Sequence, residues 1–192
     1  MTKTKLRVLC FGEAMVELSS LNFNKKVAQI TFAGDTLNTA VYLKRLLGFT
    51  ADVDYLTVIG KDYISEEMHI IDLIDINTKG SFNKVSINKE GKEAKSIFKP
   101  LKRYSGSSLI EIQILTGRTH QIRAQCEKIN KNIANDNKYG CSYFNKHLKN
   151  SGIKRLGLHS YEISFLDLKE KRNTFFADYD DEFENILSYL KT

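Results

Sequence analysis

The sequence predicts a chain of two parts, an α/β segment over residues 1–75 and an α+β segment over residues 76–192. In the first part, apolar runs that suit strands alternate with stretches of helical spacing, an order typical of a parallel sheet. In the second part, extended runs are separated by the turn pairs Glu90-Gly91 and Ser105-Gly106. This spacing predicts an antiparallel meander within a mixed, largely antiparallel sheet with flanking helices.

Four elements are expected in the first part. The apolar run "LRVLCFG" (6–12) predicts a strand, and "DTLNTAVYLKRLLG" (35–48) predicts a helix that ends at a glycine. A second strand is expected over "DVDYLTVIG" (52–60) and a second helix over "DYISEEMHIIDLI" (62–74). The order is therefore β–α–β–α.

The second part begins with the meander and continues with helices and a hairpin. Three extended runs lie between Lys84 and Leu115. The remaining expected elements are a helix from Thr119 to about Ile129, a helix over 143–152, a hairpin over 156–179 and a helix over 181–191.

The charge distribution also separates the two parts. The whole chain of 192 residues has a net charge of +6. Residues 1–68 hold eight Lys or Arg and eight Asp or Glu, whereas residues 79–172 hold 20 basic and eight acidic residues. Such an excess attracts phosphate polyanions. A solvated, lysine-rich surface is the alternative interpretation.

Composition excludes several classes of protein. Cys10, Cys126 and Cys141 are widely spaced and form no C-x-x-C pair, so neither a disulfide framework nor a metal site is expected. No charged leader precedes a signal-like apolar segment, and no apolar run approaches the ~20 residues that cross a bilayer. We therefore expect a soluble, cytoplasmic protein with no membrane partner.

The stretch "FAGDTLNTA" carries side chains suited to a sugar. Gly34 permits close approach of a ligand, Asp35 is placed to cap the following helix, and Asn38 offers a donor and an acceptor for hydroxyls. A capped helix after a turn is the structural alternative.

A family resemblance covers residues 7 to about 68. "RVLCFGEAMVEL", "FAGDTLNTAVYLKRL" and "VDYLTVIGKDYISEEM" resemble the N-terminus of PfkB-type, ribokinase-like sugar kinases, especially 2-keto-3-deoxygluconate kinases. The resemblance implies a ribokinase-like βαβα fold and a sugar acid as ligand, with Gly34, Asp35 and Asn38 at the sugar site and Glu13 near the end of the first strand. The late "GAGD"-like motif that holds ATP phosphates is absent, so no kinase activity is expected.

A second candidate site is "TGRTHQIRAQ" (116–125). Gly117 permits a tight turn, Thr119 is placed to cap a helix, and Arg123 lies four residues later on the same face. Together with Arg118 and His120 at the turn, this pattern suits a phosphate or carboxylate. A salt-bridged helix start is the alternative.

The motifs "EGKEAKSIFKPLKRYSGSSLIEIQILTGRTHQIRAQ", "IANDNKYG" and "FNKHLKNSGIKRLGLHSYEISF" resemble the C-terminal half of the catalytic domain of bacterial ribosomal RNA pseudouridine synthases of the type that acts on large-subunit RNA. This resemblance covers roughly residues 82–190 and implies isomerisation of uridine in ribosomal RNA, without cofactor, on a flipped base. It implies that Arg123 pairs with a catalytic aspartate. The other residues that it assigns to the RNA pocket and its loops are Arg118, Thr119, His120, Gln121, Asp136, Tyr139, Gly140, Leu158 and His159.

The chain departs from this family at the catalytic position. The nucleophilic aspartate of the family's "HRLDxxTSG" motif has no counterpart upstream of residue 82, and none of Asp52, Asp54, Asp62, Asp72 and Asp75 has that context. Smaller departures are found at Gln125, Asn132 and Ser160, where the family has histidine, proline and alanine. The sequence therefore predicts an Arg123 whose carboxylate partner the chain does not supply.

The sequence as a whole is interpreted as a hybrid whose two parts join between His69 and Lys84. The expected function is weak, salt-dependent binding of ribosomal RNA without isomerase activity, and self-association through strands whose partners are missing. The alternatives are a sugar-kinase-related protein and a rearranged gene product without selected function.

Overall fold

The computed structural model describes residues 14–22, 27–34, 51–60, 63–76, 84–166 and 170–191, with side chains from residue 52 onward. Its elements follow one another along the chain as β1 (Ala14–Asn22), β2 (Val27–Gly34), β3 (Ala51–Gly60), β4 (Met68–Asp75), β5 (Ser86–Ile87), β6 (Lys92–Tyr104), β7 (Ser107–Ile114), α2 (Gln121–Lys128), α3 (Ser142–Asn150), β8 (Leu158–Leu166), β9 (Arg172–Phe176) and α4 (Asp181–Tyr189).

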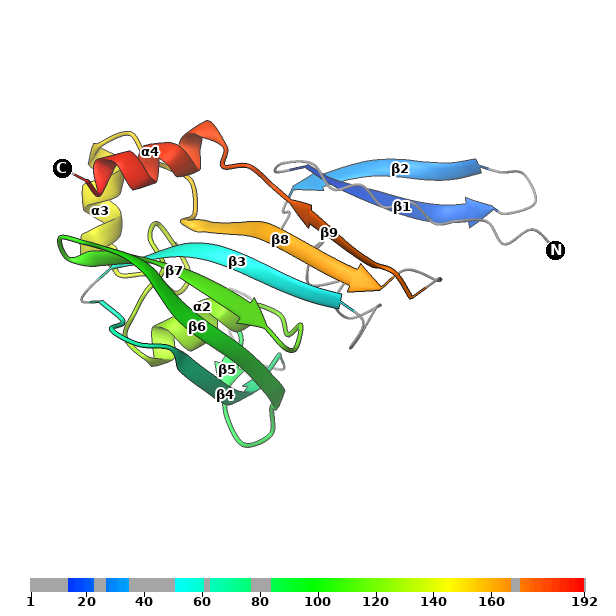
Figure 1. Cartoon of the computed structure of the whole chain (residues 1–192), viewed down its shortest axis with the longest axis horizontal. Helices are drawn as coiled ribbons and strands as arrows, with labels where there is room; N and C mark the ends of the chain where they lie inside the picture. The colour runs from blue at the N-terminus through cyan, green and yellow to red at the C-terminus, as the bar shows by residue number, and fades with distance from the viewer. Residues whose placement is uncertain are drawn as a thin grey trace.

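Seven of these strands form one sheet in the order β5-β4-β6-β7-β3-β8-β9 (Figure 1). The three helices of the second part, the β8–β9 hairpin and the β6–β7 pair of the predicted meander are found where the sequence predicts them. The first run of the meander is wrong in its pairing, because β5 pairs with β4, which lies between β5 and β6. The turn between β6 and β7 contains Gly106 at a φ of 70°, a left-handed conformation that glycine adopts without steric cost. The antiparallel architecture predicted for the second part is therefore confirmed.

The helix predicted over residues 62–74 is wrong, because Met68–Asp75 is strand β4. β4 pairs antiparallel with β6 along most of its length. Burial alternates along the strand, with Ile70, Asp72 and Ile74 turned inward and the residues between them exposed or half-buried. This period of two is that of a strand with one buried face.

The strand predicted over residues 52–60 is confirmed as β3, but its neighbours are not those of a parallel sheet. β3 lies between β7 and β8 and is antiparallel to both. All pairings among the described strands are antiparallel, so the parallel sheet predicted for the first part is not found in them. Strands β3 and β4, both before residue 76, thus share a sheet with strands that follow it.

The N-terminal strands β1 and β2 form a separate two-stranded antiparallel sheet, which the sequence did not predict. Ala14 lies opposite Gly34 in this hairpin. The strand predicted over residues 6–12 and the helix predicted over residues 35–48 lie outside the described residues.

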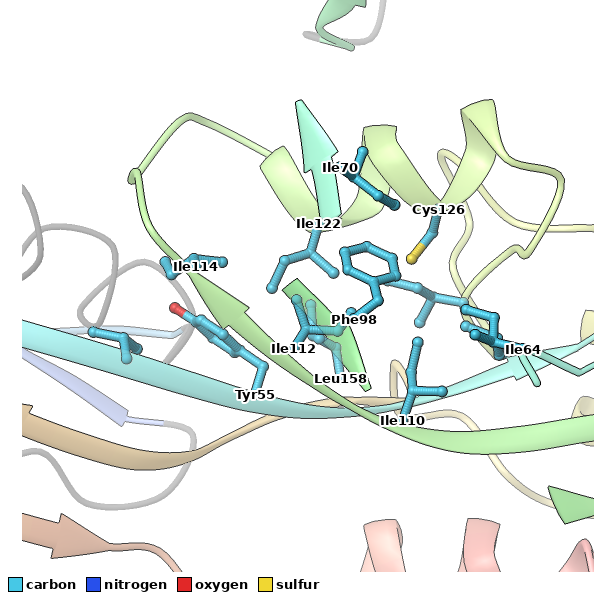
Figure 2. Close-up of a cluster of buried hydrophobic side chains, with 13 residues drawn as sticks. Tyr55, Ile64, Ile70, Phe98, Ile110, Ile112, Ile114, Ile122, Cys126 and Leu158 are labelled. Atoms are coloured by element: carbon cyan, nitrogen blue, oxygen red, sulfur yellow. The ribbon is translucent and has the colours of Figure 1, made fainter. Parts of the chain in front are cut away.

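One face of the seven-stranded sheet is covered by α2. Figure 2 shows Ile122 and Cys126 of this helix directed at Phe98 and Ile112 of the sheet, with Tyr55 of β3 beside them. All five side chains are buried. Because burying a large apolar side chain stabilises a fold by roughly 1.5–3 kcal/mol, this cluster holds α2 firmly on the sheet.

The opposite face of the sheet packs against α3 and α4. Leu56 and Val58 of β3 form a second buried cluster with Leu148 of α3 and Phe183 of α4. Helix α4 begins at Asp180, whose side chain accepts the Phe183 backbone N–H at 2.8 Å. This N-cap satisfies one of the otherwise unpaired donors of the first turn.

Within the described part of the chain, no helix has the length and apolar character needed to span a membrane.

Candidate functional site

The loop between β7 and α2 is held by the side chain of Gln121. Its Oε1 accepts the backbone N–H of Arg118 at 3.0 Å and the hydroxyl of Thr116 at 2.8 Å. Its Nε2 donates to the carbonyl of Lys95 at 2.9 Å. The buried amide of Gln121 therefore ties the loop to strand β6. Losing these hydrogen bonds would destabilise the fold, because a buried amide without partners carries the free-energy cost of its desolvation.

Gln125, one turn later, extends this network. Its Oε1 accepts the hydroxyl proton of Ser96 at 2.8 Å, and its Nε2 donates to the Ala94 carbonyl at 3.2 Å. Gln125 is fully buried. The glutamine at this position thus has partners for both ends of its amide, so α2 tolerates it where the resemblance expects a histidine.

The N-cap of α2 is His120 and not Thr119, so the predicted position of the cap is wrong by one residue. His120 adopts a φ of 52°, and its side chain makes no capping hydrogen bond. It turns instead toward Tyr139, whose hydroxyl lies 2.9 Å from Nδ1. The loop therefore presents His120 to the 133–140 loop.

Arg123 forms a bidentate ion pair with Asp136. Nε donates to Oδ2 and a terminal nitrogen donates to Oδ1, each at 2.7 Å. The side chain of Asp136 is fully buried and that of Arg123 is 13% exposed. The expectation that Arg123 has no carboxylate partner is therefore wrong, because Asp136 pairs with it. The absence of the family's catalytic aspartate stays a prediction.

Asp136 is fixed from several directions. Its Oδ1 also accepts the backbone N–H groups of Lys138 and Tyr139, at 2.8 and 3.0 Å. Burial raises the pKa of Asp136, but the hydrogen bonds and charge of Arg123, with these two N–H groups, outweigh burial and hold the pKa below 3.8. Asp136 is thus an ionised carboxylate whose oxygens are already engaged.

The loop around Asp136 requires glycine at position 140. A Cβ atom there would lie 2.1 Å from the Asp136 carbonyl oxygen and 2.8 Å from Asn145 Nδ2. Asn145 itself donates to that same carbonyl at 2.8 Å. Helix α3 and the Asp136 loop are therefore packed as one unit.

The Tyr139 side chain links His120 to Val85, the residue before β5. Its hydroxyl accepts the backbone N–H of Val85 at 2.8 Å, and its ring packs edge-to-face against His120 at 5.4 Å. Burial raises the pKa of Tyr139, so the hydroxyl stays protonated at neutral pH. Burial, and then the charges of Arg123 and Lys138, lower the pKa of His120 to about 4.

We expect His120 to remain mostly neutral at pH 5.5, where a histidine of ordinary pKa near 6.5 is about nine-tenths protonated. Because its folded pKa lies below the unfolded value, its contribution to stability is complete above pH 6.5 and is lost as the pH falls toward about 4. Long-range ¹H–¹⁵N NMR spectra measure the protonation, and a His120→Gln variant assigns the signal. A midpoint near 6.5 in the folded protein would contradict the buried arrangement with Tyr139.

His159 lies apart from this group in its contacts. Its Nε2 is 3.2 Å from the Ala177 carbonyl oxygen, and its ring packs against Tyr179 and Phe183. Burial lowers the pKa of His159, as suits a neutral core histidine. The structure therefore places His159 under α4, in the core rather than among the pocket residues with which the resemblance groups it.

Arg118, by contrast, is half-buried beside the network. Its Nε donates to the Glu93 carbonyl at 2.7 Å. The structure thus brings seven of the predicted residues to the α2 N-terminus and the facing loop, and these are Arg118, Thr119, His120, Gln121, Arg123, Asp136 and Tyr139.

The residues predicted for a sugar site lie mostly outside the described residues. This applies to Glu13, Asp35 and Asn38, while Gly34 is the last residue of β2. The described part of the chain contains no group of His, Cys, Asp and Glu side chains that suits a metal ion.

Asp72 is a buried carboxylate to which the sequence alone assigns no role. It pairs with Lys128 of α2, and its side chain is 1% exposed. The sequence signal for a buried carboxylate was an acidic residue within the apolar run 68–75. That signal indicates burial of Asp72 only if the run is a strand, in which residues 70, 72 and 74 share one face.

The profile of the RNA pseudouridylate synthase family matches residues 36–128, so the match begins inside the stretch that resembles sugar kinases. A ribosomal large subunit pseudouridine synthase C of Buchnera aphidicola subsp. Baizongia pistaciae is 37% identical over 120 residues, which is 62% of this chain and 38% of that protein. The same enzyme of Haemophilus ducreyi is 35% identical over 108 residues, covering 56% and 34%.

Solved structures support the fold. A human protein, RNA pseudouridylate synthase domain containing 4, matches with a TM-score of 0.62 at 17% identity, over 92% of this chain and 76% of that chain. Human RNA pseudouridylate synthase domain containing 1 matches with a TM-score of 0.60, also at 17% identity, over 90% and 78%. This chain spans little more than a third of the length of the two bacterial relatives.

Proposed function

We propose that this chain, whose residues 36–128 match the RNA pseudouridylate synthase family, binds ribosomal RNA but does not convert uridine to pseudouridine. The family match and the bacterial relatives, which are named for the large ribosomal subunit, support RNA as the partner. The basic excess of residues 79–172 supports it as well, because lysine and arginine bind phosphates and release counterions.

The proposed inactivity rests on the absence of the family's catalytic-aspartate motif, together with the observation that Asp136, the carboxylate that pairs with Arg123, is not free to replace that aspartate. A carboxylate that attacks a base must reach it, yet the Asp136 side chain is fully buried and its oxygens accept four hydrogen bonds from Arg123 and two backbone N–H groups. The guanidinium of Arg123 is in turn occupied by Asp136. The resemblance implies an arginine paired with a nucleophile in the pocket, and here the pair belongs to the core.

We expect no pseudouridine above a protein-free control when pure protein is incubated with undermodified large-subunit RNA. We also expect the protein to retain the same RNA at low salt and to release it as the salt concentration rises, because phosphate contacts do not need a complete pocket. Mass spectrometry of the nucleosides and filter retention measure the two quantities.

Formation of pseudouridine would contradict the proposal. An aspartate-to-asparagine series would then identify the nucleophile, and the residues to be changed are Asp52, Asp54, Asp62, Asp72 and Asp75. Absence of RNA retention at low salt would contradict the binding half of the proposal.

The sugar-kinase resemblance stays a hypothesis about the N-terminal residues, and so does the hybrid origin of the chain. Residues 51–60 and 68–75 form strands of the seven-stranded sheet, so the hypothesis rests on the residues before them. A thermal-shift titration with keto-sugar acids tests it.

Self-association is a further part of the proposal. Strand β9 is an edge of the sheet, and its Phe175 and Phe176 are 51% and 68% exposed. Open strand edges with exposed aromatic residues favour pairing between copies. Sedimentation at several concentrations measures it.

A further inference from the structure

Two stretches of the chain, residues 94–110 and 137–157, carry four and five Lys or Arg residues and no Asp or Glu. The first contains the turn between β6 and β7, and the second contains α3. Six of these cations are exposed and form no ion pair with a carboxylate that the structure describes, namely Lys102, Arg103, Lys138, Lys146, Lys149 and Lys154.

The two stretches meet at one end of the sheet. Ser107, just after the turn, lies opposite Gly60 of β3. The Phe144 ring of α3 lies against Gly60, since a Cβ atom at this glycine would be 2.5 Å from the ring. Tyr104 and Phe144 pack against the same buried cluster. Figure 1 shows the β6–β7 turn and α3 at the same end of the molecule.

Flat side chains lie among these cations and face solvent. The guanidinium carbon of Arg103 is 3.2 Å from the centre of the Tyr63 ring, and Tyr63 is 43% exposed. Tyr143 on α3 is 73% exposed and packs edge-to-face against His147 at 4.6 Å. Exposed aromatic rings and guanidinium planes are the groups on which unpaired bases stack.

We propose that this end of the sheet binds single-stranded RNA, with unpaired bases stacking on the Arg103–Tyr63 pair and on Tyr143 while nearby lysines neutralise the phosphates. The inference rests on the RNA binding proposed above and assigns it to one surface. We call this the basic-aromatic surface, and its residues are Tyr63, Lys102, Arg103, Tyr143, Lys146 and Lys149.

Unpaired RNA fits this surface better than a duplex does. In a duplex the phosphates are accessible but the bases are paired and stacked on one another. A duplex would therefore contact the lysines but not the aromatic rings and the Arg103 guanidinium. An acidic protein segment would likewise use the charges alone.

The basic-aromatic surface is anchored to the Asp136 loop. Asn145 of α3 donates to the Asp136 carbonyl, and Lys149 Nζ donates to Asn137 Oδ1 at 2.8 Å. Helix α3 therefore holds its Tyr143 face in a fixed position relative to that loop. A preformed surface binds with less loss of conformational entropy than a loose one.

Fluorescence anisotropy with three labelled probes tests the inference, using a short unstructured RNA, its paired duplex and an abasic strand of equal length. Replacing Tyr63 and Tyr143 together with alanine should weaken binding of the unstructured RNA about tenfold or more, because stacking of one base contributes roughly five- to 150-fold. Binding of the abasic strand should not change. Replacing Lys102 and Lys146 with glutamine should lower the salt slope by about 1 to 1.5.

The matched control replaces Lys89 and Lys92 with glutamine. This variant removes the same charge at the opposite end of β6, where Lys92 is the first residue of the strand and Lys89 precedes it, and both lysines are exposed. It should leave the slope nearly unchanged. An equal loss of slope in the control, an unchanged affinity in the tyrosine variant, or displacement of RNA by polyglutamate at equal charge would each overturn the basic-aromatic surface.

These outcomes separate the two proposals. If the wild-type protein retains no RNA at low salt, the proposed function and the surface both fail. If it retains RNA and the tyrosine variant binds equally well, only the surface fails. Circular dichroism of each variant verifies that the fold is kept.

Discussion

Replacing Asp136 with alanine should lower the free energy of unfolding by about 3–5 kcal/mol, because the change leaves the Arg123 guanidinium largely buried without its partner. Part of this loss in stability comes from the backbone N–H groups of Lys138 and Tyr139, which would no longer have an acceptor. Urea denaturation at pH 7 measures the change. Asp136→Asn should cost less, since the amide oxygen still accepts these two N–H groups.

Glu93→Ala is the matched control. Glu93 pairs with Lys95 at 2.9 Å, but both side chains are exposed, at 52% and 39%. Exposed pairs contribute about 0–1 kcal/mol. An Asp136→Ala variant no less stable than this control would show that the buried pair does not hold the loop.

The contribution of Asp136 should also depend on pH. Its folded pKa lies below the ordinary value of 3.8, so the stabilisation is complete above pH 3.8 and is lost as the pH falls through the folded pKa. The difference in stability between the wild type and Asp136→Asn should therefore narrow only at strongly acidic pH.

Replacing Phe183 with alanine should cost about 3–5 kcal/mol, because the ring is fully buried and its removal leaves a cavity between α4 and the sheet. The ring contacts His159 and Tyr179, with centroids at 5.4 and 5.3 Å. The guanidinium carbon of Arg155 lies 5.2 Å from the same ring. Urea denaturation measures the loss, and hydrogen exchange should find α4 less protected than β6 and β7.

Phe176→Ala serves as the control for size and chemistry. This phenylalanine is 68% exposed on the edge strand β9, so truncation should cost less than about 1 kcal/mol. Equal losses at Phe183 and Phe176 would contradict the packing of α4.

The second part of the chain was predictable because its local signals agree with its tertiary structure. In α4, apolar residues at 183, 186, 187 and 190 follow the period of a helix. The Ser105-Gly106 pair gives the turn between β6 and β7. Each of these segments needs only neighbours close in sequence to be recognised.

The sequence predicted which residues lie together at the candidate site, but it did not predict which of their side chains pair with one another. The motif 116–125 and the later loop were placed together by resemblance. Whether Arg123 meets a carboxylate depends on the fold, which brings the loop of Asp136, 13 positions later in the sequence, against α2. His159 entered the predicted pocket by resemblance alone, and its contacts with Phe183 could be found only after α4 was placed.

The sequence alone determined the β6–β7 hairpin, the three helices after residue 115 and the basic character of the C-terminal region. Only the tertiary structure decided the state of residues 68–75 and the partner of Arg123. The physical reason is the same in both cases. Apolar residues at 64, 68 and 71 fit a helix, but the backbone hydrogen bonds that make β4 a strand come from β6, in which the partner of Ile74 is Lys92 and the partner of Met68 is Phe98. Likewise, Arg123 and Asp136 form their ion pair only once the packing of the sheet, α2 and the loop has buried both side chains.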